Sequence, residues 1–153
     1  MTNVASEGVA TECSAATEFR WPLRVYIEDT DAGGIVFYVN YLKYMERART
    51  EFMRAHGYDK AAVFGVDLMF VVRNVSIAYR RPARLDDELA ATARIVEQRA
   101  AQLTFEQRIL RGDEELCGGH VNIACVERAT MKPARIPEDL LIALGASASG
   151  RNE

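Results

Sequence analysis

The segment from 28 to 38 reads Glu28-Asp29-Thr30-Asp31-Ala32-Gly33-Gly34-Ile35-Val36-Phe37-Tyr38 and precedes the only long helical pattern of the chain. Asp and Gly are common turn residues, so such a string can simply reverse the direction of the chain. The same residues can also form a reaction site. Asp supplies a nucleophile or a base, and backbone N–H groups at the start of a helix supply a positive field for an oxyanion. The segment alone leaves both interpretations open, and the rest of the chain must decide between them.

The two flanks of this segment predict a strand and then a helix. Apolar and polar residues alternate over 23–27, which is typical of a strand. Over 38–56 one side carries apolar residues three or four positions apart, and Gly57 is well placed to end a helix. The apolar side of this helix comprises Tyr41, Met45, Ala48 and Phe52, and charged residues fill its other side: Lys43, Glu46, Arg47, Arg49 and Glu51.

The remainder of the chain changes to a period of two. Alternating segments predict strands at 75–80, 89–97, 103–110 and 121–126, with breaks at 84–87 and 111–113. The second break is short enough for a hairpin, so neighbouring strands should be antiparallel. A short helix is predicted at 137–144. One long helix against an antiparallel sheet of five strands is an α+β architecture.

Composition indicates one soluble domain. The chain has 153 residues, of which 49% are hydrophobic and 27% charged, and no apolar run approaches the roughly 18 residues that cross a bilayer. We expect a disordered tail at 1–17, one domain at 18–144 and a flexible tail at 145–153. The N-terminal segment lacks the basic and apolar regions of a signal peptide, so a cytoplasmic location is expected.

Charge and cysteine usage narrow the classes of ligand. The net charge of −3 argues against general nucleic-acid binding. Cys13, Cys117 and Cys125 are odd in number and lack the spacing of metal ligands, which favours reduced thiols and predicts no metal site.

Two strings resemble one known family. The segment 26–36, together with Tyr41-Leu42 and the segment 46–51, is similar to the YbgC-type acyl-CoA thioesterases of the 4-hydroxybenzoyl-CoA thioesterase family. The segment 79–87, Tyr-Arg-Arg-Pro-Ala-Arg-Leu-Asp-Asp, resembles a second segment of that family. The resemblance covers roughly 23–138, and it implies a hotdog fold, in which the sheet wraps around the long central helix.

The resemblance also implies roles for individual residues. Asp31 matches the catalytic carboxylate, which attacks the thioester carbonyl or activates the water that does, and the backbone N–H of Tyr38 would polarise that carbonyl. Many YbgC-type members carry His where this chain has Tyr38, so a proton transfer that depends on His is not expected here. Gly33 and Gly34 are candidate substrate-binding residues of the loop. Glu46 matches a helix carboxylate used by a neighbouring subgroup, or it is an ordinary ion-pair partner on the helix surface. A thioester is already activated for acyl transfer, so no cofactor is expected.

The sequence offers alternatives for the residues that bind the CoA phosphates. Arg99 matches a basic position of the family, whereas Ala100 and Ala101 stand where two further basic residues occur. Lys132 and Arg135 could compensate, or they are solvated surface charges. The acyl carrier could accordingly be CoA or an acyl carrier protein.

The resemblance implies a homodimer or homotetramer. Hotdog sheets usually join edge to edge, and their active sites then form at the subunit boundary, which also covers an exposed strand edge. Two other functions are considered. A hydratase normally needs a His beside a carboxylate in the loop and helix, and this chain has none there. A non-catalytic scaffold that binds lipid-synthesis enzymes, associated with the Tol-Pal envelope system, is the alternative from another class.

Overall fold

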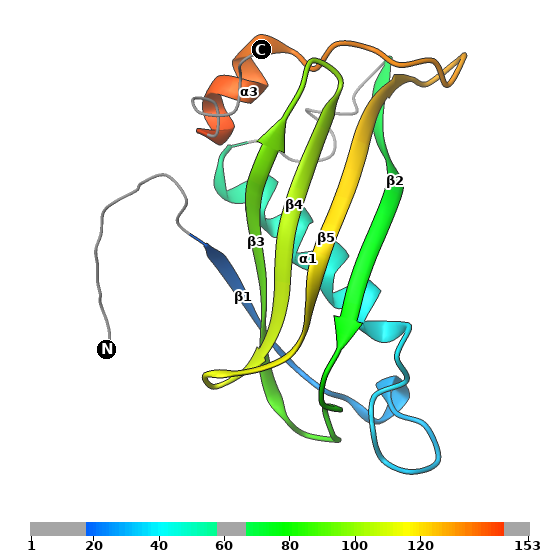
Figure 1. Ribbon diagram of the computed structural model, residues 1–153, viewed down its shortest axis with the longest axis vertical. Coiled ribbons are helices and arrows are strands. Elements are labelled where there is room, and N and C mark those ends of the chain that lie inside the picture. The colour runs from blue at the N-terminus through cyan, green and yellow to red at the C-terminus, as the bar shows by residue number, and fades with distance from the viewer. Residues whose placement is uncertain (1–17, 58–66, 146–153) are drawn as a thin grey trace.

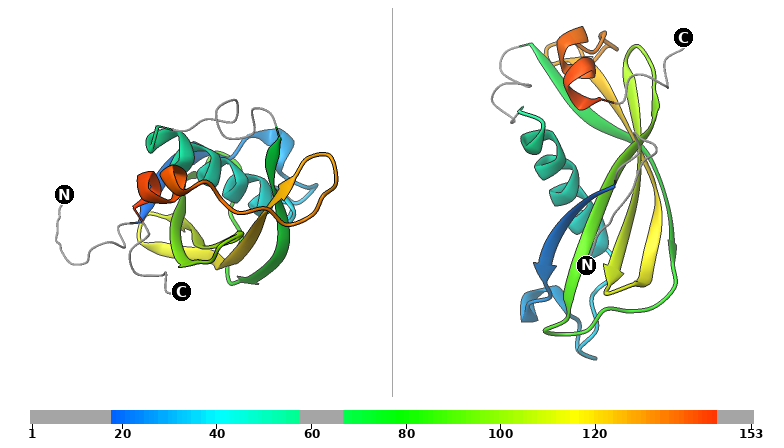
Figure 2. Two further views of the ribbon diagram at one scale, coloured as in Figure 1. Left: turned by 90° about the horizontal axis from the view of Figure 1, so that it is seen from above. Right: turned by 90° about the vertical axis from the view of Figure 1, so that its left-hand side faces the viewer.

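The computed structural model describes residues 18–57 and 67–145. One five-stranded sheet and one long helix make up most of the fold, with the helix against one face of the sheet (Figures 1 and 2). The elements are, in chain order, β1 (Phe19–Arg24), the 3-10 turn η2 (Ile27–Asp29), α1 (Asn40–Ala55), β2 (Leu68–Tyr79), β3 (Glu88–Gln98), β4 (Gln102–Arg111), β5 (Glu114–Glu127) and α3 (Glu138–Leu144).

The sheet is antiparallel throughout, with strand order β1-β3-β4-β5-β2. The predicted hairpin at 111–113 is confirmed: β4 and β5 are joined by a turn in which Gly112 has φ +63°. A φ in this region suits glycine because it has no Cβ. The order also places β2, which follows α1 in the chain, at the edge of the sheet opposite to β1. The α+β class and the hotdog fold are therefore confirmed.

The apolar side predicted for the helix forms the core. Tyr41, Met45, Ala48 and Phe52 are all buried, and α1 packs mainly on β1, β3 and β4. The helix is slightly shorter than the predicted 38–56, and it is followed by Gly57 with φ +89°. It leaves the half of the inner sheet face formed by β5 and β2 less covered.

The first strand differs from its prediction. It spans Phe19–Arg24 rather than 23–27, and Tyr26 and Ile27 are 62% and 75% exposed. The chain leaves the sheet because the carboxylate of Asp29 accepts a hydrogen bond from the Tyr26 N–H at 2.9 Å, which closes the turn η2. Local side-chain bonding to the backbone competes here with continuation of the strand.

The C-terminal helix is confirmed. Pro137 precedes α3, and Gly145, with φ +71°, ends it. The predicted tail at 1–17 and the chain beyond Gly145 lie outside the described residues. Within 18–57 and 67–145, no helix is long and apolar enough to cross a membrane.

The two cysteines that the structure describes behave as small apolar residues. Cys117 and Cys125 are free thiols buried in β5, and burial raises the pKa of Cys117 to about 12. A buried thiol that is so hard to ionise is a poor nucleophile. Cys13 lies outside the described residues.

Candidate active site

The acidic segment forms a tight loop in front of α1. Thr30 and Val36 pair as an isolated antiparallel bridge, and the Asp31 N–H donates to the Ile35 carbonyl at 2.9 Å. The Gly34 N–H donates back to the Asp31 carbonyl at 3.0 Å, and Gly34 has φ +80°. The turn therefore requires a glycine at 34, and Asp31 is the residue at which the turn begins.

One carboxylate oxygen of Asp31 is fixed by the loop itself. Asp31 Oδ1 accepts a hydrogen bond from the Gly33 N–H at 2.8 Å. The side chain is exposed in the single subunit, and its Oδ2 makes no hydrogen bond within the described residues. The carboxylate is thus held in one orientation with a free oxygen presented to the outside.

The segment 83–85, which follows β2, is hydrogen-bonded to this loop. The Val36 N–H donates to the Ala83 carbonyl at 2.9 Å, and the Leu85 N–H donates to the Gly34 carbonyl at 3.2 Å. The Ala83 N–H in turn donates to the Tyr41 hydroxyl at 2.8 Å. Tyr41 belongs to α1, so the loop, the helix and the segment 83–85 after β2 form one hydrogen-bonded unit.

Asp29 links the same loop to the start of the helix. Its carbonyl accepts hydrogen bonds from the Asn40 side chain at 2.8 Å and from the Phe37 N–H at 3.0 Å. The hydroxyl of Tyr44, one turn after Asn40, is buried without a hydrogen-bond partner within the described residues. Burial, and then the Asp29 carboxylate, raise the pKa of Tyr44 well above its usual range. The Tyr44 hydroxyl therefore stays neutral.

The backbone at the start of α1 offers a donor. The Tyr41 N–H donates to the Tyr38 carbonyl at 3.2 Å, so the first turn already begins at Tyr38. The Tyr38 N–H donates no hydrogen bond within the described part of the chain. A free N–H at a helix start carries part of the positive end of the helix dipole, which suits an oxyanion.

Beside this donor lies an exposed apolar surface, which we call the inner strip. Its members come from the start of α1, the residues just before it and the inner face of β2, and each is between 37% and 59% exposed: Tyr38, Leu42, Val72, Val75 and Tyr79. The rings of Tyr38 and Tyr79 are in contact, with centroids 6.0 Å apart. Large apolar side chains that lie this open and this close together mark a surface with a partner or a ligand.

Two polar residues lie where the inner strip meets the core. Arg49 is half-buried and donates to Gln107 Oε1 at 2.9 Å. Gln107 is completely buried, and its amide donates to the Met45 and Thr92 carbonyls, both at 2.9 Å. Burial lowers the pKa of Arg49, and nearby Glu46 partly offsets this. Arg49 was expected among the charged residues on the outer side of the helix, and that expectation is wrong.

Comparison with known proteins now decides the family. The model of the thioesterase superfamily matches residues 33–118, which spans the end of the loop, α1 and most of the sheet. The chain belongs to the thioesterase superfamily. It is therefore an enzyme, a thioester hydrolase.

Proteins similar to this thioesterase are themselves named as thioesterases. The acyl-CoA thioester hydrolase YbgC of Escherichia coli is 42% identical over 126 residues, which cover 82% of this chain and 94% of the relative. The acyl-CoA thioesterase YbgC of Haemophilus influenzae is 40% identical and covers 80% of this chain and 90% of the relative. A crystal structure of a probable thioesterase from Bartonella henselae is 36% identical, with a TM-score of 0.75, over 79% of this chain and 100% of that chain.

The other residues suggested by the sequence lie apart from the loop. Glu46 is exposed on α1 of this thioesterase, where its charge acts on Arg49. Arg99 is exposed and donates to Glu97 at 2.9 and 2.6 Å, so its charge is already paired in the free subunit. Lys132 and Arg135 are exposed as well. The structure therefore brings Asp31, Gly33 and Gly34 together and leaves the basic candidates outside this unit.

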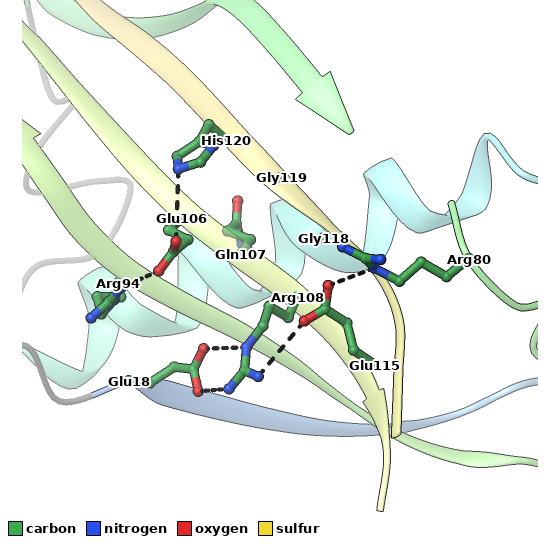
Figure 3. A pocket seen from close by; sticks show the side chains of 10 residues that line it. All are labelled: Glu18, Arg80, Arg94, Glu106, Gln107, Arg108, Glu115, Gly118, Gly119 and His120. Carbon is green, nitrogen blue, oxygen red and sulfur yellow. Dashed lines mark hydrogen bonds and ion pairs between the residues drawn. The ribbon is translucent and has the colours of Figure 1, made fainter. Parts of the chain in front are cut away.

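The opposite face of the sheet carries a hollow of about 610 Å³. Figure 3 shows that its charged walls face one another in pairs, such as Arg80 with Glu115 at 3.2 Å and Arg108 with Glu18 at 2.9 Å. Arg94 likewise pairs with Glu106. Three arginines are thus matched by three glutamates, and Asp31 does not line this hollow. The hollow is an ion-paired outer surface of the thioesterase, separate from the loop.

Gln107 and Arg49 are the site residues that sequence reasoning missed. Gln107 is the single polar residue at the inward positions of the predicted strand 103–110, among Leu103, Phe105 and Ile109. A lone polar residue in an apolar row needs a hydrogen-bonding partner. A polar residue at an apolar position was therefore the signal in the sequence for Gln107. The same signal implied a polar partner for it, which is Arg49.

Proposed function

We propose that this thioesterase hydrolyses acyl-CoA to a free acid and CoA, with Asp31 as the nucleophile or general base. The observation that carries the proposal is the Asp31 carboxylate: the Gly33 N–H holds one of its oxygens, and the other makes no hydrogen bond within 18–57 and 67–145. The start of α1 belongs to the same hydrogen-bonded unit, and the Tyr38 N–H there has no acceptor among the residues that the structure describes. Relatives named acyl-CoA thioester hydrolases support the choice of substrate.

Both versions of the chemistry use the same groups. Asp31 either attacks the carbonyl carbon or takes a proton from the water that attacks it. Negative charge then develops on the carbonyl oxygen, where the Tyr38 N–H and the helix dipole stabilise it. The C–S bond breaks, CoA leaves as a thiolate that acquires a proton, and the acid is released directly or by hydrolysis of an acyl-Asp31 intermediate.

We place the complete site at a boundary between two copies of the chain. In one subunit Asp31 is exposed, and so is the inner strip. Among the described residues, β2 pairs only with β5 and leaves its other edge open. A second copy along this edge would cover the strip, exclude water from the loop and give a homodimer, with a homotetramer as the larger alternative.

The test is turnover of Asp31→Asn on a panel of acyl-CoAs, with release of thiol as the readout. Loss of a general base or nucleophile should lower kcat about 10²- to 10⁴-fold. Asp113→Asn, in the turn between β4 and β5, is the matched control and should keep wild-type turnover. Near wild-type rates for Asp31→Asn would remove Asp31 from this role.

A panel that includes acyl carrier protein substrates separates the carriers. Activity on acyl carrier protein without activity on acyl-CoA would change the carrier and leave the chemistry intact. Wild-type protein that turns over neither, yet retains lipid-synthesis enzymes in a pull-down, would favour the scaffold linked to the Tol-Pal system.

A further inference from the structure

We infer that Arg49, anchored by Gln107, forms the floor of the acyl-binding site and limits this thioesterase to short acyl groups. The inference rests on the proposed function, because it assumes that the acyl group leaves the Tyr38 N–H along the inner strip. Three observations support it: the position of Gln107 in the sheet, the position of Arg49 on α1, and the bonding of the guanidinium.

The strand register shows how far Gln107 lies from the Tyr38–Tyr79 contact along the sheet. Gln107 pairs with Gly119, which pairs with Ile77 of β2. Tyr79 lies two residues after Ile77 in the same strand, and its ring contacts Tyr38. Two residues of a strand span about 7 Å. Gln107, Gly119 and Ile77 form one cross-strand row of the sheet, and Tyr79 belongs to the next row on the same face. Along the strand direction, the Arg49–Gln107 pair is therefore only about 7 Å from the row that Tyr38 contacts.

The helix gives a second measure. Leu42 and Arg49 are seven residues apart and share one flank of α1, and Tyr38, four residues before Leu42, continues the same line just ahead of the helix. From Asn40, where α1 begins, to Arg49 the axis rises by about 14 Å at 1.5 Å per residue. Side chains on a helix lean toward its N-terminus, so the guanidinium lies closer to Tyr38 than the backbone of Arg49 does. An extended palmitoyl chain is longer than this space.

The bonding of Arg49 explains why a longer chain would be rejected. Within the described residues its guanidinium makes one hydrogen bond, to a neutral amide, and no ion pair. Its remaining N–H groups have no acceptor among the described residues, and because Arg49 is only partly buried, solvent water can satisfy them. An apolar chain that reached this far would remove that water and supply no acceptor, and a buried charge without compensation is unfavourable.

The experiment compares the chain-length profiles of wild type, Arg49→Met and Arg47→Met on CoA esters from acetyl to palmitoyl. Arg47 is the matched control, because it lies over the Tyr44 ring on the other flank of the same helix. Wild type should prefer short esters. Arg49→Met should raise the ratio of kcat/KM for decanoyl-CoA to that for butyryl-CoA at least tenfold, whereas Arg47→Met should leave the ratio unchanged.

If Arg49→Met does not fold, a second variant still tests the inference. Arg49→Lys keeps a charge at the floor and should keep the short-chain profile even if total activity falls. An unchanged ratio in folded Arg49→Met, or a wild type that prefers palmitoyl-CoA, would overturn the inference while Asp31-dependent turnover still upheld the proposed function. Absence of turnover by wild type on every ester would overturn both.

Discussion

At the scale of single residues, Gly119 shows how closely β2 and β5 approach each other. A Cβ added to Gly119 would lie 1.9 Å from the Ser76 carbonyl oxygen and 2.8 Å from the Ile77 Cα, both backbone atoms of β2. At Gly118 the nearest atom to an added Cβ is Glu115 Oε2 at 2.7 Å, the end of a flexible side chain. The two adjacent glycines are therefore required to different degrees, since a side chain can move aside and a paired backbone cannot.

Gly119→Ala should destabilise the protein by about 1–3 kcal/mol, because overpacking forces the β2 backbone to shift. Gly118→Ala should cost less, about 0.5 kcal/mol, since Glu115 can rotate away. Chemical denaturation of both variants measures the two differences. Equal losses would mean that the tight contact with Ser76 does not constrain this position.

At the scale of elements, the turn between β2 and β3 supports the candidate site as much as α1 does. Asp87 accepts hydrogen bonds from the Arg84 N–H at 2.8 Å and from the Arg111 side chain at 2.7 Å. Leu85 of the same turn donates to Gly34. Burial alone would raise the pKa of Asp87, but the Arg84 N–H and Arg111 outweigh it, and the pKa lies below its ordinary 3.8. The charged carboxylate thus ties the turn, and with it the acidic loop that contains Asp31, to β4.

Asp87→Asn should lower stability by about 1 kcal/mol at pH 7, as expected for a charge-assisted bond that is partly exposed. A carboxyl with a lowered folded-state pKa stabilises fully above its unfolded value and loses that contribution as pH falls through the folded value. The difference from wild type should therefore be present at pH 7 and shrink by pH 3. Urea denaturation at both values measures it, and Asp86→Asn is the control in the same turn. A difference of the same size at pH 3 would contradict the role of the charge.

Sequence patterns predicted those elements whose environment is set locally. The apolar positions of α1 repeat at helical spacing, and the β4–β5 turn contains Gly112, so both were foreseen. The first strand was misplaced because the Asp29 carboxylate bonds Tyr26 and ends the alternation early. Arg49 was misassigned because its partner Gln107 lies 58 residues away, and only the sheet order brings the two together. The support of the Asp31 loop was not foreseen either, because Val36 and Gly34 bond Ala83 and Leu85, which lie about 50 residues further along the chain.

At the scale of the whole molecule, the two edges of the sheet differ in their capacity to pair. β1 has six residues and contains Pro22, which cannot donate a backbone hydrogen bond. β2 has twelve residues, most of them exposed, and it borders the inner strip. A long exposed edge beside apolar side chains is a typical site for association with another sheet. The asymmetry favours β2 over β1 as the edge of the proposed contact between two copies of the chain.

Val75→Lys tests this assembly, because Val75 belongs to the inner strip and is 41% exposed. A lysine there would bury a charge without a partner at the proposed boundary, so we expect dissociation into monomers and loss of most turnover. Val96→Lys is the matched control, since Val96 is 44% exposed on β3, away from the inner strip. Light scattering after size-exclusion chromatography measures the mass, and thiol release measures activity. Wild-type mass and turnover for Val75→Lys would place the boundary elsewhere, whereas a folded monomer with full activity would show that one subunit carries the complete site.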